Sequence, residues 1–305
     1  MNHIKKIVGV LMLLFITAVT AQQDPNFIFY RYNMNVINPA YAGSVVKQEV
    51  GSVPKRVTQL GLNLRSQWSG VQGAPETQSI FFSTGLAKNL GFGVSVINDR
   101  TFIENQTWIT ADFSYKVKFN ENTNLFLGVK AGGNSYNANL DGLTSFGIAA
   151  DPSTSDIQGV FNPTFGLGAL LQGERFFVTV SVPNVLTSER LQERDGEAKL
   201  GQSRQHFYLG GGMDFEFSND FILKPSVVAR YVDSSPFTID FTAAFELEQK
   251  FEFGLNYRLN EGIGGLFMFK GTDWIDFGYA YEAPSASPIV QTTNGSHEVV
   301  TRFTF

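Results

Sequence analysis

The chain has 305 residues, of which 30 are glycine, 29 are phenylalanine and only 17% are charged. It carries no cysteine, which excludes disulfides, thiolate metal sites and a lipid anchor on a cysteine. Its formal charge of −5 comes without a basic patch, which argues against nucleic-acid binding. Many phenylalanines and glycines without a long apolar run in the body of the chain favour an all-β protein over a helical membrane protein.

Residues 1–21 have the pattern of a secretory signal peptide. Lys5 and Lys6 form a positive start, and the apolar run over residues 7–19 that follows is too short to span a bilayer. The small residues up to Ala21 fit a signal-peptidase site, so we expect cleavage after Ala21 and export of the mature chain. An uncleaved anchor helix is the alternative.

The next stretch, residues 22–55, is an aromatic N-terminal segment that we call the leader. Residues 24–44 have neither helical nor alternating periodicity and contain two prolines and five aromatic residues: Phe27, Phe29, Tyr30, Tyr32 and Tyr41. A turn is marked at Asn38 and Pro39, and three small residues follow that allow another backbone to approach closely: Ala40, Ala42 and Gly43. A disordered leader is the alternative, but so many aromatic side chains argue against it.

Residues 56–305 divide into segments of about ten residues with alternating hydrophobicity, the length of a tilted transmembrane strand. In residues 237–247, for example, large apolar residues occupy every second position, and Asp240 and Glu246 lie between them. A soluble β-sandwich also alternates, but its core rarely places large aromatics on every strand. We therefore predict an all-β outer-membrane barrel of about 14 antiparallel transmembrane strands, at 56–67, 77–86, 90–99, 108–118, 124–134, 163–172, 175–182, 204–217, 220–232, 237–248, 250–260, 262–270, 274–283 and 297–305.

The connections between these strands alternate in length. Every second one is short, such as 119–123, whereas most of the others are long, such as 100–107 and 183–203. Short periplasmic turns and long outer loops are typical of bacterial barrels, and an even strand number leaves both barrel ends in the periplasm. The connections 233–236 and 260–262 are short although they should face outward, which leaves a wrong strand count open.

The face of these strands that should line the lumen carries charges of both signs. In this register the inward charged residues are Arg65, Asp112, Lys116, Lys130, Asp214, Glu216, Arg230, Asp240, Glu246, Glu252, Arg258 and Arg302. A selective open pore shows one dominant sign, whereas mixed signs predict internal ion pairs in a narrow or plugged lumen. The leader cannot enter lipid with an unpaired backbone, so we expect it to dock in the lumen or at the periplasmic mouth.

The last predicted strand, 297–305, ends in an aromatic residue. Its alternating apolar face includes Val299, Thr301, Phe303 and Phe305. Such an ending resembles the signal by which barrel-assembly machinery recognises outer-membrane proteins, so Phe303 and Phe305 are the candidate assembly signal. A solvated edge strand that happens to end in phenylalanine is the alternative.

The sequence offers little for catalysis. His206 and His297 have no ligand-like partners nearby in sequence, and no G-x-S-x-G or H-E-x-x-H motif is present. A barrel lipase would pair a histidine such as His206 with a serine on a neighbouring strand. The stretch 151–156 offers acidic and hydroxyl oxygens for a weak Ca²⁺ site, but it lacks the ligand density of an EF-hand loop. We therefore expect no enzyme, no catalytic residue, no cofactor and no metal site.

Two motifs resemble the PorP/SprF outer-membrane proteins of type IX secretion and gliding systems in Bacteroidetes. One lies in the leader and one in the first long loop, and together they include Asp24, Pro25, Tyr32, Asn33, Asn38, Pro39, Ala40, Tyr41, Ala42, Gly43, Arg65, Gln67, Trp68, Gly73, Ala74 and Pro75. The glycine-rich stretches "LGFGVSVIND" and "NPTFGLGALL" resemble later strands of that family. The resemblance covers essentially the whole mature chain.

The resemblance implies a non-enzymatic barrel that partners type IX secretion and anchors or helps export a large cell-surface adhesin through the adhesin's C-terminal sorting domain. A core component that contacts periplasmic lipoproteins and ring assemblies is one alternative, and a diffusion channel or hydrophobic-solute transporter is another. Outer-membrane lipid is a further expected partner. As a hypothesis, Tyr41 and its neighbours pin the leader into the barrel, while residues 65–75 shape the first outer loop.

Overall fold

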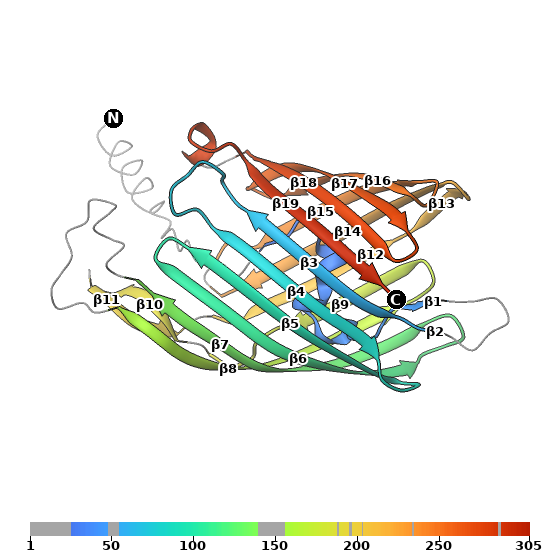
Figure 1. Cartoon of the computed structure of the whole chain (residues 1–305), viewed down its shortest axis with the longest axis horizontal. Coiled ribbons are helices and arrows are strands. Elements are labelled where there is room, and N and C mark those ends of the chain that lie inside the picture. The colour runs from blue at the N-terminus through green and yellow to red at the C-terminus, as the bar shows by residue number, and fades with distance from the viewer. Residues whose placement is uncertain are drawn as a thin grey trace, which may run out of the picture.

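The structure is a computed structural model that describes residues 26–47, 55–139, 156–187, 189–194, 197–202, 204–233, 235–285 and 288–305. Within these ranges, antiparallel strands run in chain order around one large sheet that closes on itself (Figure 1). The strands of this sheet are β3 (Thr58–Ser66), β4 (Glu76–Gly85), β5 (Leu90–Thr101), β6 (Glu104–Lys118), β7 (Asn124–Ala138), β8 (Ile157–Gln172), β9 (Phe176–Val182), β12 (His206–Met213), β13 (Phe215–Ser218), β14 (Phe221–Val232), β15 (Thr238–Leu247), β16 (Phe251–Arg258), β17 (Gly262–Thr272), β18 (Ile275–Pro284) and β19 (Ser296–Thr304).

Three pairings close the ring. β3 pairs with β19, the last strand of the chain, and β12 pairs with both β9 and β14. β12 and β13 pair with the same strand, β14, on either side of Asp214, so they are two halves of one transmembrane strand. The barrel therefore has fourteen strands, as predicted, and the short connections at 233–237 and 259–261 belong to an even-stranded barrel.

The alternating pattern places apolar side chains outside and polar side chains inside. On β15, Phe241 and Phe245 are exposed, whereas Asp240 and Glu246 are buried. An apolar outer face and a polar inner face are the arrangement that a barrel needs to stand in lipid. Among the described residues, no helix is long and apolar enough to cross a membrane.

The two rims of the barrel differ, and we call them the turn end and the loop end. The turn end carries the connections 86–89, 119–123, 173–175, 219–220, 248–250 and 273–274. The loop end carries 67–75, 102–103, 139–156, 183–205, 233–237, 259–261 and 285–295. Both ends of the strand sequence meet at the turn end, where the backbones of Thr58 and Phe305 exchange hydrogen bonds of 2.8 and 3.0 Å.

One predicted connection was wrong. The sequence favoured a long loop over 100–107, but β5 and β6 continue to a two-residue turn at Phe102 and Ile103. Phe102 adopts φ of +56°, a backbone conformation that is usually supplied by glycine or asparagine. Because the turn has neither residue, nothing in its sequence signalled the reversal.

Two small hairpins accompany the barrel. β10 (Glu189–Arg194) pairs with β11 (Glu197–Gln202) within the 183–205 connection at the loop end. β1 (Val46–Lys47) pairs with β2 (Lys55–Arg56) where the leader meets β3. Neither hairpin was predicted, since each is too short to show a clear alternation in sequence.

Candidate functional site

The part of the leader over residues 26–43 lies inside the ring of strands, where it appears in blue in Figure 1. It folds into three short turns of helix, α2 (Tyr30–Asn33), η1 (Met34–Val36) and η2 (Pro39–Tyr41), which satisfy several of its backbone groups locally. Phe27, Ile28 and Phe29 are each at most 2% exposed. The leader is therefore docked in the lumen, and the barrel wall supplies the surface that its aromatic side chains need.

The first described residues of the leader are held near the loop end. The Glu298 carboxylate accepts hydrogen bonds from the backbone N–H groups of Ile28 (2.6 Å) and Phe29 (3.2 Å). The Arg258 guanidinium donates to the carbonyl oxygen of Phe27 at 3.0 Å. Glu298 is the third residue of β19 and Arg258 is the last residue of β16, so both lie beside the loop end.

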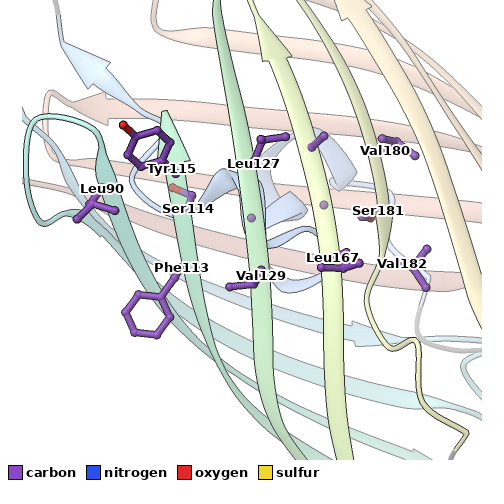
Figure 2. A pocket seen from close by; sticks show the side chains of 13 residues that line it. Leu90, Phe113, Ser114, Tyr115, Leu127, Val129, Leu167, Val180, Ser181 and Val182 are labelled. Carbon is purple, nitrogen blue, oxygen red and sulfur yellow. The ribbon is translucent and has the colours of Figure 1, made fainter. Parts of the chain in front are cut away.

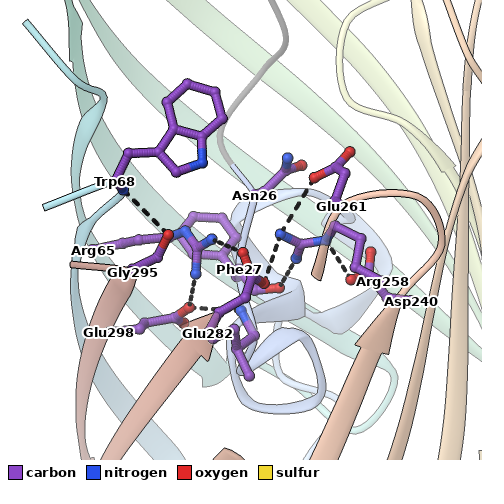
Figure 3. A network of polar contacts seen from close by, with 12 residues as sticks. Asn26, Phe27, Arg65, Trp68, Asp240, Arg258, Glu261, Glu282, Gly295 and Glu298 are labelled. Carbon is purple, nitrogen blue, oxygen red and sulfur yellow. Dashed lines mark hydrogen bonds and ion pairs between the residues drawn. The ribbon is translucent and has the colours of Figure 1, made fainter. Parts of the chain in front are cut away.

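These contacts belong to a buried ion network, which we call the loop-end network (Figure 3). Arg258 bonds Asp240 at 2.6 Å and Glu282 at 3.1 Å. Arg65 joins Glu282 at 3.1 Å and Glu298 at 3.3 Å. Every one of these side chains is nearly inaccessible to solvent. Buried charges are tolerated when each has a partner, so the network ties five strands and the leader into one unit.

A connection residue completes the network. Glu261, in the 259–261 connection, lies 3.8 Å from Arg258. Burial raises the pKa of the Glu261 carboxyl, and the Arg258 guanidinium lowers it only in part. The loop end of the lumen thus gathers more carboxylates around Arg258 than one guanidinium neutralises, and Arg65 and Arg230 supply the remaining positive charge.

The leader is also held by charges farther toward the turn end. The Tyr32 hydroxyl donates to the Glu252 carboxylate at 2.5 Å, and Arg31 pairs with Asp214. Lys224 lies between Glu246 and Glu252 and pairs with both. Several of the inner charges that the sequence predicted to be paired therefore form two networks, each of which the leader contacts, while Lys130 pairs separately with Asp112 and Arg302 with Asp276.

The motif residues 38–43 lie on a track of glycines in the wall. A β-carbon at Gly128 would lie 2.3 Å from the backbone nitrogen of Ala40, and one at Gly91 would lie 1.9 Å from the carbonyl oxygen of Ala42. A β-carbon at Gly168 would lie 1.9 Å from Asn38 Oδ1. Contacts this short are impossible for a real side chain, so glycine at these wall positions allows the leader to reach the backbone of the strands.

Hydrogen bonds hold the leader in this track. Asn38 Oδ1 accepts from the backbone N–H of Ala40 at 2.8 Å, which fixes the turn at Pro39. Asn38 Nδ2 donates to the Thr179 hydroxyl on β9 at 2.6 Å. Gly91 and Gly128 lie close to the turns at 86–89 and 119–123. The leader therefore runs from the loop end at residues 26–29 to the turn end at residues 40–43.

Apolar packing fills the space between these polar contacts. Phe27, Tyr30, Met34, Val36 and Ile37 pack with Phe81, Tyr208 and Val228 of the wall, and Tyr41 packs against this cluster and against a second one around Phe126 and Leu170. Two cavities border the leader and measure about 20 and about 60 Å³. A cavity of that size holds one or a few water molecules, so the leader occupies the space that fourteen strands would otherwise enclose.

Seen from outside, the wall behind the track carries a shallow apolar groove of about 620 Å³ (Figure 2). Its side chains include Phe113, Leu127, Val129, Leu167 and Val180, and the helical turns of the leader lie behind the strands in this view. Aliphatic and aromatic residues that point away from the lumen are typical of a lipid-facing surface.

The second motif forms an ordered loop at the loop end. Trp68 adopts φ of +48°, and its backbone N–H donates to the Ser296 hydroxyl at 3.2 Å. The carbonyl oxygen of Gly73 accepts from Phe102, and that of Pro75 accepts from Gln67, both at 2.9 Å. Residues 67–75 of the motif therefore join three neighbouring connections of the loop end, whereas Arg65 lies in the lumen.

The family of the chain follows from a match that covers nearly all of its residues. Residues 19–303 match the family described as "Type IX secretion system membrane protein PorP/SprF". The chain belongs to the PorP/SprF family. This is a family of secretion-system membrane proteins rather than of enzymes, and it confirms the resemblance seen in the two motifs.

Solved barrel structures that this PorP/SprF chain resembles share little sequence identity with it. The KdgM porin is 12% identical, with 81% of this chain and 99% of that chain covered and a TM-score of 0.41. The CymD monoaromatic hydrocarbon channel is 14% identical, with 88% and 90% covered and a TM-score of 0.46. The Pseudomonas putida toluene transporter TodX is 10% identical, with 88% and 95% covered and a TM-score of 0.46. No curated protein matches the chain significantly.

The PorP/SprF chain places its predicted site residues at four places. Tyr32 and residues 38–43 lie in the lumen, Arg65 lies in the loop-end network, and Trp68, Gly73 and Pro75 lie in the first loop. At the turn end, Phe303 stacks on Trp274 with ring centroids 6.1 Å apart, and Phe305 is 63% exposed. Asp24 and Pro25 lie outside the described residues, as do the predicted signal peptide and residues 151–155 of the acidic stretch.

Sequence reasoning missed several members of the two networks. Glu282, Glu298, Lys224 and Lys270 were not among the predicted inward charges, although each pairs inside the lumen. The alternating pattern could have identified these four residues as inward-facing, since residues two apart on a strand share a face. Glu216 was predicted to line the lumen, but its side chain is 43% exposed at the turn end, where it pairs with Arg175.

The two histidines that the structure describes, His206 and His297, lie on different strands. His206 is buried at the start of β12, and a ring nitrogen of His297 lies 2.8 Å from the Tyr279 hydroxyl. In the part of the chain that the structure describes, no three His, Asp or Glu side chains are arranged to hold a metal ion. His206 packs beside Tyr208 and His297 beside Tyr281, within the sheet.

Proposed function

We propose that this PorP/SprF barrel is a non-conducting outer-membrane partner of type IX secretion, which anchors or helps export a large cell-surface adhesin through the adhesin's C-terminal sorting domain. The observation that supports it best is the leader, whose aromatic residues and networks fill the lumen. A barrel whose interior is occupied by its own chain acts through its surfaces, and its partners meet it at the two rims.

The filled lumen argues against a diffusion channel or a solute transporter. A diffusion channel needs a continuous hydrated path, and a solute transporter needs a binding cavity along that path. Here the leader makes hydrogen bonds to opposite walls, to Glu298 on β19 and to Thr179 on β9. Ion flow would require the leader to leave a site in which it is held by charge-assisted hydrogen bonds.

We further propose that the turn end faces the periplasm and the loop end faces outward, as in other bacterial barrels with short turns and long loops. Because the chain has no cysteine, single cysteines can report the orientation. Asp233→Cys lies at the loop end and Asn122→Cys at the turn end, and both residues are exposed. On intact cells a membrane-impermeant maleimide should label the first variant, and should label the second only after the outer membrane is opened. The reverse pattern would invert the orientation.

The function itself is tested by a mild-detergent affinity pull-down from native outer membranes, with every co-eluting protein identified. We expect a very large secreted protein with a C-terminal sorting domain to co-purify with the barrel. Periplasmic lipoproteins and ring components in its place would make the barrel a core part of the machine. A barrel that elutes alone and conducts ions in planar bilayers would contradict the proposal.

A further inference from the structure

The first loop encloses a cavity that is separate from the lumen. It lies between residues 66–76, the β5–β6 turn and the last residues of β7, and it measures about 720 Å³. Its lining comes from these three parts of the barrel, and the described leader residues do not contribute to it. We call this cavity the loop-end cup. Its volume is typical of sites that bind small molecules or short segments of chain.

The walls of the loop-end cup are pre-organised. The backbone N–H of Phe102 donates to Gly73 at 2.9 Å, and that of Asn139 donates to Ile103 at 2.9 Å. On the other side, Ser69 donates to Gly295 at 2.7 Å. Trp68 and Phe102 hold positive φ angles within these loops. Non-glycine residues persist in that conformation only where the surroundings enforce it, which is common at ligand clamps.

The chemistry of the cup is polar and nearly neutral. Its lining includes five carboxamide side chains, Gln67, Gln72, Asn105, Asn137 and Asn139. One guanidinium, Arg100, is set against two carboxylates, Glu76 and Glu104, so an anionic ligand is disfavoured. Carboxamides both donate and accept hydrogen bonds, as peptide groups do. Trp68, Val71 and Ile103 add apolar contacts that suit a side chain between two peptide groups.

We infer that the loop-end cup binds a short, extended peptide segment without net negative charge, carried by a secreted partner. The inference rests on the proposed function, because a barrel of protein secretion meets polypeptide at its outer rim. The carboxamides pair with the backbone of the segment, and the apolar patch takes one of its side chains. The motif residues around Trp68 and Gly73 do not line the lumen, and they form one wall of this site.

Site-specific photo-crosslinking in native cells tests this inference. The photoreactive residue p-benzoylphenylalanine replaces Gln72 on the rim of the cup, and the matched position is Asp233, which is exposed at the same end outside the cup. We expect a crosslink to a secreted protein from position 72 only, mapped by peptide sequencing to one short segment. Equal crosslinking from both positions would overturn the inference.

A double substitution tests the role of the carboxamides at constant size. Asn105 and Asn137 use their Oδ1 atoms as acceptors for Asn98 and Gly159, so N105D/N137D keeps those bonds, removes the two NH2 donor groups and adds two negative charges. The crosslink from position 72 should fall about tenfold. The control N120D/N122D makes the same change at the turn end, where Asn120 Oδ1 accepts from the Asn122 backbone, and should leave the crosslink unchanged.

The outcomes separate the cup from the proposed function. If the wild-type barrel co-purifies with its secreted partner but gives no crosslink from position 72, the cup inference fails and the proposed function stands. If the product from position 72 is removed by a glycosidase rather than by a protease, the ligand is a saccharide and the peptide inference is wrong. If the double variant folds and crosslinks as the wild type does, the carboxamides do not form the site.

Discussion

Replacing Gly128 with valine is expected to expel the leader from the lumen. A β-carbon at this position would lie 2.3 Å from the backbone nitrogen of Ala40 and 2.4 Å from the backbone carbon of Pro39. β7 cannot move away, because it is paired along its length with β6 and β8. Limited proteolysis should then cut the variant within residues 26–43, which we expect to be protected in the parent barrel. Planar-bilayer recordings should show ion conductance where the parent shows none.

The matched control is Gly265→Val on β17. A β-carbon at Gly265 meets no atom within 4 Å, and this position faces outward. The control variant should retain both the protease protection and the closed state, while a barrel that lacks residues 26–44 should conduct as Gly128→Val does. If Gly128→Val stays protected and closed, the glycine track is not what admits the leader.

Replacing Arg258 with methionine should lower the free energy of unfolding of the barrel by about 3–5 kcal/mol. Arg258 is fully buried and bonds Asp240, Glu282 and the carbonyl oxygen of Phe27. Methionine fills much of the same volume but leaves two buried carboxylates without this partner. Denaturant unfolding in detergent, followed by tryptophan fluorescence, measures the change. The loop-end part of the leader should also become accessible to protease.

Two further variants test whether the loss comes from the buried network. Arg175 pairs with Glu216, but the two side chains are 58% and 43% exposed, so Arg175→Ala should cost at most about 1 kcal/mol. Adding Asp240→Asn to Arg258→Met should restore part of the loss, because it removes one of the unpaired charges. Equal losses for Arg258→Met and Arg175→Ala would show that the loop-end network does not stabilise the barrel.

The leader crosses the lumen of the closed ring from one end to the other. Its described residues lie in the lumen from Asn26 at the loop end to Gly43 at the turn end, and β3 begins at the turn end. The chain therefore runs through its own barrel before it builds the wall.

Local patterns in the sequence determined the strands. On a strand, successive side chains point to opposite faces, so the contrast between lipid and lumen appears directly as alternation. The run from Phe237 to Leu247 predicted β15, and the same rule placed Arg258 and Asp240 on the inner face. The rule failed at 100–107, where alternation weakens near the rim and the turn at Phe102 carries no glycine.

The partners of the inward residues were decided only by the tertiary structure. The backbone of Ile28 meets the carboxylate of Glu298 across 270 positions of sequence, and no local pattern encodes such a pair. In the sequence, Gly128 and Gly168 do not differ from the other glycines of the strands. Only the structure shows that Ala40 and Asn38 lie against them, where a side chain would not fit. The alternation of apolar and polar residues follows from one strand alone, because one face meets lipid and the other meets the lumen. The leader's site exists only once fourteen strands have closed around it.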